Sequence, residues 1–250
     1  MSYSSFAQYY DCLTRNVEYE KRADYFCRVL EHLHHSPGIT LDLACGTGSL
    51  TVALAKRGLD VYGIDGSPAM LSVAQQKAAE NGLNLLFLCQ KMQNIDLYGT
   101  VDTVVCALDS INHLTSEADV LKAFQRVSLF LDPDGVFIFD MNTVYKHKCV
   151  LANQVFVYDM DEVYCVWQNR LEEKTSRIGI TLDFFGRDGN VYHRSSERFY
   201  ERAYRMEQIV SLLARAGLEA VCAFDDLSFV PPREDSERIV IAAKKISENK

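Results

Sequence analysis

A glycine turn flanked by two carboxylates is the part of the sequence best suited to chemistry. Residues 41–48 read LDLACGTG, and Asp65 ends the next apolar segment. Glycines between a strand and a helix let a ligand approach the backbone, and the helix N-terminus favours polar or acidic groups. A carboxylate such as Asp65, after the second strand, can accept both hydroxyl hydrogens of a ribose. The pattern therefore predicts a site for a nucleoside-containing ligand.

Asp42 decides between two classes of nucleoside ligand. A dinucleotide site requires G-x-G-x-x-G, and here Thr51 occupies the position of the third glycine. Asp42 ends the first strand, where its charge would repel a pyrophosphate but attract the ammonium group of S-adenosylmethionine. The prediction is therefore an S-adenosylmethionine site, and a nicotinamide-dependent oxidoreductase is disfavoured. The structural alternative is an ordinary turn with a solvent-facing Asp42.

Alternating strands and helices must position this turn. Short apolar segments predict strands at 39–44, 60–64, 83–89, 101–108 and 136–141, separated by helices at 49–57, 67–81 and 116–131. A further helix is expected at 18–34, and a turn at 132–135. The strands are almost continuously apolar, which is typical of a parallel sheet buried on both faces. A doubly wound α/β fold is expected.

The pattern changes after the fifth strand. Residues 148–202 alternate apolar and polar positions and lack a helical period, which predicts three or four antiparallel strands with a hairpin turn at 187–190. A helix at 206–216 and strands at 218–224 and 238–244 then resume the α/β pattern. We expect a cofactor domain at 1–146 and 203–250, and an inserted antiparallel β domain at 147–202 that covers the substrate.

Two motifs resemble a known family. Residues 42–48 (DLACGTG) resemble the first motif of class I S-adenosylmethionine-dependent methyltransferases, and residues 61–71 (VYGIDGSPAML) resemble their second. The resemblance covers about residues 36–142 and 203–245. It implies a Rossmann-like sheet whose last strand, 238–244, is antiparallel.

The resemblance also implies how the cofactor is held. Asp42 and the backbone of Ala44, Cys45 and Gly46 would bind the methionine end, and Asp65 the ribose.

The same resemblance places the adenosine. Gly66 and Met70 would line it. Lys91 stands where the family often has an acidic residue for the adenine amino group, so adenine recognition would depend on the backbone around Met92.

An N-terminal segment resembles the lid of small bacterial methyltransferases of this type. Tyr10 and Tyr19 would cover the cofactor, and the alternative is that they pack the helix onto the sheet.

Methyl transfer from a sulfonium requires alignment and exclusion of water, and a base only when the nucleophile arrives protonated. Asp109 follows the fourth strand, where the family lines the junction of cofactor and substrate. We expect Asp109 to contact the cofactor or orient the substrate and His113 to accept a proton. The alternative is a helix-start aspartate and a packed histidine. No metal is predicted.

Composition restricts the partners. The 250 residues carry 26 Lys+Arg and 34 Asp+Glu, a net charge of −8, which makes nucleic acid an unfavoured partner. The eight cysteines form no C-x-x-C pair, and the chain shows no signal-peptide pattern and no membrane-length apolar segment. We expect a cytoplasmic enzyme with a small-molecule methyl acceptor, and no oligomeric state is indicated. The alternatives are an RNA or protein methyltransferase and a non-catalytic S-adenosylmethionine-binding module.

Overall fold

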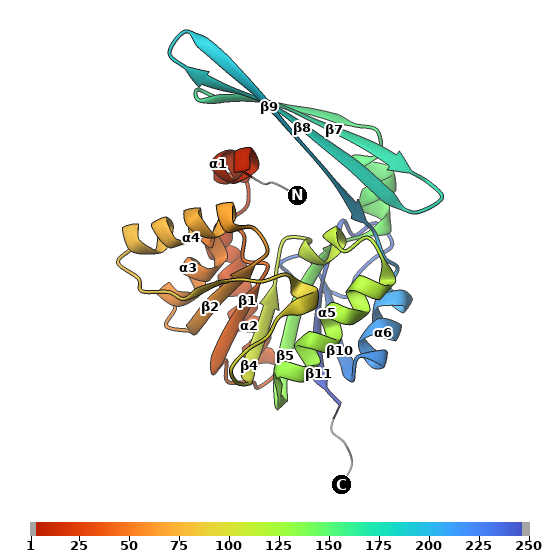
Figure 1. Ribbon diagram of the computed structural model, residues 1–250. Helices are drawn as coiled ribbons and strands as arrows, with labels where there is room; N and C mark the ends of the chain where they lie inside the picture. The colour runs from red at the N-terminus through yellow and green to blue at the C-terminus, as the bar shows by residue number, and fades with distance from the viewer. Residues whose placement is uncertain (1–3, 247–250) are drawn as a thin grey trace.

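A computed structural model describes residues 4–246 of the chain, so the two ends of the predicted cofactor domain, 1–3 and 247–250, lie outside it. A seven-stranded sheet forms the body of the molecule, and a four-stranded sheet projects above it (Figure 1). None of the helices within residues 4–246 combines the length and apolar character needed to cross a membrane.

The large sheet has the order β10-β11-β5-β4-β1-β2-β3. Its pairs are parallel except that β11 is antiparallel to both β5 and β10. The predicted fold class, including the antiparallel last strand, is therefore confirmed. The strands are β1 (Ile39–Leu43), β2 (Asp60–Asp65), β3 (Phe87–Cys89), β4 (Val101–Cys106), β5 (Leu131–Asn142), β10 (Leu218–Asp225) and β11 (Arg238–Lys245).

Helices cover both faces of this sheet. Alternation along β5 sends Phe137 and Phe139 to the core beneath one helix pair, and Val136 and Ile138 to the opposite core. The first pair is α5 (Glu117–Phe130) and α6 (Met206–Arg215); the second is α2 (Tyr19–His32) and α3 (Ser49–Lys56); α4 (Pro68–Glu80) packs near β2 and β3. Both faces of the strands are thus buried, as their continuous apolar character requires.

The inserted sheet is strictly antiparallel, in the order β6-β7-β8-β9. Its strands are β6 (Val155–Asp159), β7 (Val163–Glu172), β8 (Arg177–Asp188) and β9 (Val191–Arg202). The apolar face of the sheet does not rest directly on the large sheet. It packs on α1 (Ser4–Leu13), where Phe6 lies 5.9 Å from Phe199 and Tyr9 lies 5.5 Å from Phe184 between ring centroids. Helix α1 therefore lies between the inserted sheet and the body (Figure 1).

Three local predictions need correction. The third strand is shorter than expected: its register with β2 covers only Phe87–Cys89, preceded by one backbone hydrogen bond from the Gly63 N–H to the Leu86 carbonyl (3.0 Å). Residues 132–135 belong to β5 but bulge out of it. Leu131 and Val136, five positions apart, pair with Val101 and Thr103 of β4, which are only two positions apart. The segment after β5 begins with a short helical turn, η3 (Lys146–Leu151), where only strands were expected.

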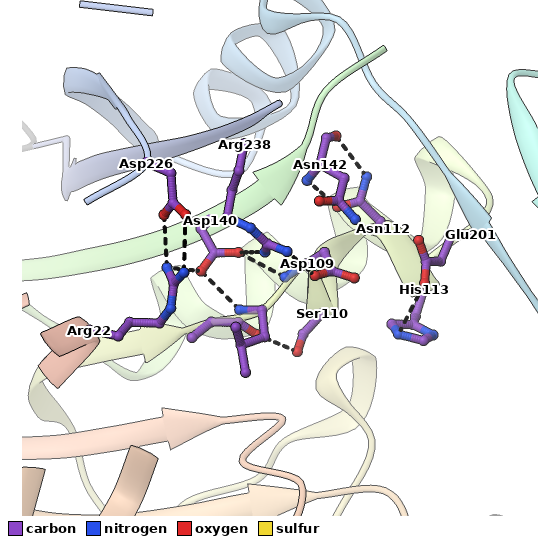
Figure 2. A network of polar contacts seen from close by, with 12 residues as sticks. Arg22, Asp109, Ser110, Asn112, His113, Asp140, Asn142, Glu201, Asp226 and Arg238 are labelled. Atoms are coloured by element: carbon purple, nitrogen blue, oxygen red, sulfur yellow. Dashed lines mark hydrogen bonds and ion pairs between the residues drawn. The ribbon is translucent and has the colours of Figure 1, made fainter. Parts of the chain in front are cut away.

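A buried carboxylate joins four elements at the carboxyl end of β5. Asp140 is fully buried and pairs with Arg22 of α2 (Nη1–Oδ2, 3.3 Å) and with Arg238 of β11. It also accepts hydrogen bonds from the backbone N–H groups of Leu108 (2.9 Å) and Asp109 (2.8 Å), after β4 (Figure 2). Burial alone would raise the pKa of Asp140, but Arg238 and Arg22 outweigh it and lower the pKa.

We predict that Asp140→Asn lowers the free energy of unfolding by about 3 kcal/mol, because it leaves two buried guanidinium groups short of their counter-charge. Urea unfolding at neutral pH measures this. Asp235→Asn is the matched control, since its pair with Arg233 is exposed. A loss for Asp140→Asn no larger than that of the control would contradict the prediction.

Candidate active site

The glycine turn after β1 has a left-handed backbone at three positions. Ala44, Gly46 and Gly48 have φ of 62°, 54° and 72°. Ala44 stands where the resembled family frequently has glycine, and its positive φ gives the physical reason for that preference. The turn also lies close to β2, because a Cβ at Gly63 would come 2.7 Å from Cys45 Sγ. This close approach brings the turn beside the end of β2.

Asp65 ends β2 and fixes the turn. Its Oδ2 accepts a hydrogen bond from the Gly46 N–H (3.0 Å), and its Oδ1 accepts one from the Ser67 N–H (2.8 Å). Each carboxylate oxygen has a second acceptor position, so Asp65 can still receive two ligand hydroxyl groups. Burial raises the pKa of Asp65, and these backbone donors act against that shift.

Asp42 is 1% exposed and does not face solvent, so the alternative of a solvent-facing strand end is wrong. Its Oδ2 accepts a hydrogen bond of 2.6 Å from the Thr51 hydroxyl. Burial, opposed by Thr51 and assisted by the charge of Asp65, raises the pKa of Asp42 to about 7. Thr51, identified from sequence only as a departure from the dinucleotide pattern, is thus the partner of this carboxyl group.

Two adjoining cavities lie at this end of the sheet. The larger cavity has a volume of about 250 Å³ and is bounded by the ends of β2, β3 and β4 and by α1. Its lining residues are Phe6, Tyr10, Ala44, Gly46, Asp65, Gly66, Ser67, Met70, Gln90, Lys91, Met92, Gln93, Leu108, Ser110 and His113. The smaller, of about 30 Å³, shares five of these residues and extends to Tyr19, Asp42, Cys45, Thr47, Ser49, Leu50 and Ala107. Asp42 is the sole carboxylate among the described residues that line the smaller cavity, and no Lys or Arg lines it.

Almost all residues predicted from sequence line one of these cavities. The residues that line only the larger cavity are Asp65, Gly66, Met70, Lys91, Met92 and His113. Those that line only the smaller cavity are Tyr19, Asp42 and Cys45, and those that line both are Tyr10, Ala44 and Gly46. Asp109 is the exception: in the described part of the chain it lines neither cavity.

Asp109 is turned toward the buried ion pairs. It has φ of 54°, after Leu108 with φ of 56°, and its Oδ1 pairs with Arg238 Nη2 at 2.6 Å. The two strained residues are held by their bonds to Asp140. The turn starts η2 (Ser110–His113). Its last residue, His113, lines the larger cavity.

Glu201, near the end of β9, lies beside His113. Its Oε1 is 3.8 Å from His113 Nε2, and its Oε2 is 3.6 Å from His147 Nε2. Burial would raise the pKa of Glu201, but contact with His147 and the charges of His113, His147 and Arg238 outweigh it and lower the pKa. Glu201 could not be identified from the sequence, because it belongs to the inserted sheet and no local motif marks it.

The atoms of Asp109, His113 and Glu201 that could ligate a metal lie within 4.8 Å of one another. The Arg238 guanidinium already neutralises Asp109 in this group, which opposes binding of a second cation.

Asp11 fixes α1 over the cavities. Its Oδ1 accepts a hydrogen bond from Thr47 Oγ1 (2.7 Å), and its Oδ2 pairs with Lys77 Nζ (2.7 Å). Helix α1 is thus bound to the glycine turn and to α4, and its Tyr10 lines both cavities. No local motif marks Asp11 apart from its place next to Tyr10.

We predict that Asp42 makes the ligand-free protein less stable as the pH rises. Its pKa is higher in the folded chain (about 7) than its ordinary value of 3.8, so folding favours the protonated form. The free energy of unfolding therefore falls by up to about 1.4 kcal/mol per pH unit between pH 3.8 and about pH 7. Above that range, Asp42 adds no further pH dependence. Between pH 5 and pH 8, the wild type should lose about 2.5 kcal/mol relative to Asp42→Asn.

Urea unfolding of both proteins at the two pH values tests this. Asp60→Asn, at the exposed start of β2, is the control and should follow the wild type. Equal pH dependence of the wild type and Asp42→Asn would show that Asp42 does not titrate as described.

Comparison with known proteins agrees with this geometry. Residues 40–135 match a family model described as a methyltransferase domain. YqeM of Bacillus subtilis (strain 168), a protein named as a methyltransferase, is 32% identical over 98% of both chains. A glycine/sarcosine N-methyltransferase of Parasynechococcus marenigrum (strain WH8102) is 28% identical over 84% of this chain and 73% of its own.

A solved structure extends the similarity to the inserted sheet. The S-adenosylmethionine-dependent methyltransferase from Clostridium acetobutylicum ATCC 824 is 36% identical, with a TM-score of 0.88 over 98% of this chain and 99% of that one. The chain belongs to the class I S-adenosylmethionine-dependent methyltransferases, and its cofactor is S-adenosylmethionine.

Proposed function

We propose that the enzyme methylates the amine nitrogen of a small molecule. The observation that supports this proposal is the cavity of about 250 Å³ beneath α1, which is lined by both Asp65 and His113. A cavity beneath α1 admits a small acceptor more readily than a folded protein or an RNA duplex. The 28% identical relative is named for glycine and sarcosine, which are small amines.

The cofactor is proposed to span both cavities. The methionine end would enter the smaller one, where the single carboxylate Asp42 suits an ammonium group and disfavours a pyrophosphate. A bound ammonium would also favour the ionised form of Asp42. The ribose would meet Asp65, and the adenine would lie among Met70, Lys91 and Met92, as the family resemblance implies.

S-adenosylmethionine, when bound, supplies an electrophilic methyl group. The chain's residues then align the acceptor and exclude water, mainly through Tyr10 and α1. An amine that arrives as an ammonium ion must lose one proton before its lone pair can attack. His113 is the proposed acceptor of that proton, and the ionised Glu201 stabilises the resulting imidazolium across 3.8 Å. Asp109 acts as a positioning residue, because it holds Arg238 and begins η2.

We predict that S-adenosylhomocysteine binds and that NAD does not. Asp65→Asn should weaken S-adenosylhomocysteine binding at least about tenfold, because a charge-assisted hydrogen bond to the ribose is lost. Isothermal titration calorimetry measures both. Asp60→Asn, on the same strand and exposed, is the control. Unchanged affinity in Asp65→Asn would remove Asp65 from the proposed cofactor contacts.

We predict that His113→Asn lowers turnover by about 100-fold with little change in cofactor affinity, because general-base catalysis is removed. The assay measures S-adenosylhomocysteine formed from a panel of small amines that includes glycine, over a range of pH. The variant should also lose the pH dependence that a base imposes.

The ring of His193 is exposed at the far end of β9, so His193→Asn is the control. Equal turnover and an equal pH profile in wild type and His113→Asn would exclude the base. Methylation of total RNA or protein extract, with no small amine accepted, would contradict the proposed acceptor class.

A further inference from the structure

A third cavity, separate from the two of the proposed cofactor site, is strongly basic. It has a volume of about 460 Å³ and is formed where the inserted sheet joins the body, near η3 and the start of α6. Five cationic side chains line it: Lys148, Lys174, Arg177, Arg202 and Arg205. Among residues 4–246 no Asp or Glu lines it, although the whole chain carries a net charge of −8. This concentration of positive charge is not explained by the proposed methyl transfer.

Two of the arginines are placed against each other. Arg177 of β8 and Arg202 of β9 are direct cross-strand partners. Their guanidinium groups share one acceptor, the carbonyl oxygen of Thr115, at 3.2 Å from Arg177 Nη2 and 3.5 Å from Arg202 Nη1. Like charges at such a pair destabilise a sheet unless an anion compensates them.

The protein supplies only part of that compensation. Glu117 pairs with Arg202 Nη2 at 3.1 Å and also accepts from Gln208. The Nε–H groups of Arg177 and Arg202 are buried, and neither has a hydrogen-bond partner within the described part of the chain. Lys148, Lys174 and Arg205 are exposed around them. The cluster thus keeps more donors and positive charge than its own acceptors satisfy.

We propose that this cavity binds a phosphorylated small molecule. Paired arginines match the oxygens of a phosphate, and five cations suit a group with at least two negative charges. A long nucleic-acid strand is less suitable, because the neighbouring positions Glu172, Glu173 and Glu207 would repel its continuing backbone.

The ligand would connect the inserted sheet to the body. Lys174, Arg177 and Arg202 come from the sheet, whereas Lys148 and Arg205 belong to η3 and the N-cap of α6. Arg202 directly follows Glu201 on β9, and successive side chains of a strand point to opposite faces, so Arg202 lines this basic cavity while Glu201 meets His113. A bound phosphate group would therefore hold the strand that carries Glu201.

The test is titration of the full chain with sodium pyrophosphate by calorimetry, against sodium chloride of equal ionic strength. We expect saturable binding by the wild type. The double variant Lys148→Gln/Arg205→Gln should bind at least about tenfold more weakly, because it removes two exposed cations of the cavity. Arg177→Lys, which keeps the charge but loses the planar donor pair, should also weaken binding.

The control is Arg194→Gln/Arg198→Gln, which removes two cations from β9 outside the cavity. It should bind pyrophosphate as the wild type does, and all variants should bind S-adenosylhomocysteine normally. Absence of saturable binding by the wild type, or an equal loss in the control, would overturn the proposal. So would tighter binding of a single-stranded RNA that displaces pyrophosphate, which would identify an RNA surface. Failure of the wild type to bind S-adenosylhomocysteine would instead contradict the proposed function and leave the test of this cavity unaffected.

Discussion

The compensation of one buried carboxylate, Asp140, is the interaction on which the arrangement of the site depends. Arg22 and Arg238 neutralise it from α2 and β11, and Asp226 accepts two hydrogen bonds from Arg22 behind them. Asp140 also accepts hydrogen bonds from the backbone N–H groups of Leu108 and Asp109, and so holds the strained backbone after β4. Because an uncompensated charge cannot stay buried, these elements must assemble together. That assembly fixes η2 and so the position of His113.

The cover of the cavity depends on apolar packing rather than on ion pairs. The inserted sheet alternates half-buried and buried residues along β8, and its apolar face needs a partner. Helix α1 supplies it through Phe6 and Tyr9, while Asp11 on another side of the same helix binds the glycine turn. One short helix therefore joins the inserted sheet to the glycine turn, and its Tyr10 lines both cavities.

The sheet, its helices and the glycine turn could be predicted from sequence because their signals are local. Apolar runs of strand length, caps such as Ser67 and the spacing of Asp42 and Asp65 lie within single elements. Thr51 was noticed, but its bond to Asp42 was not, since that bond requires the first turn of α3 to lie over β1. Asp109 lies after β4 as expected, but its side chain accepts a hydrogen bond from Arg238, which is 129 residues away in the sequence.

The sequence by itself determined the fold class and the class of nucleoside cofactor, and it predicted residues that line the two cavities, because hydrophobic periodicity and turn chemistry act between near neighbours. Only the tertiary structure decided which charges meet. It brought Glu201 to His113, Asp11 to Thr47, and Arg177 against Arg202. It also buried Asp42, which raises its pKa to about 7. Burial and electrostatic partners depend on segments far apart in the chain, and no local pattern records them.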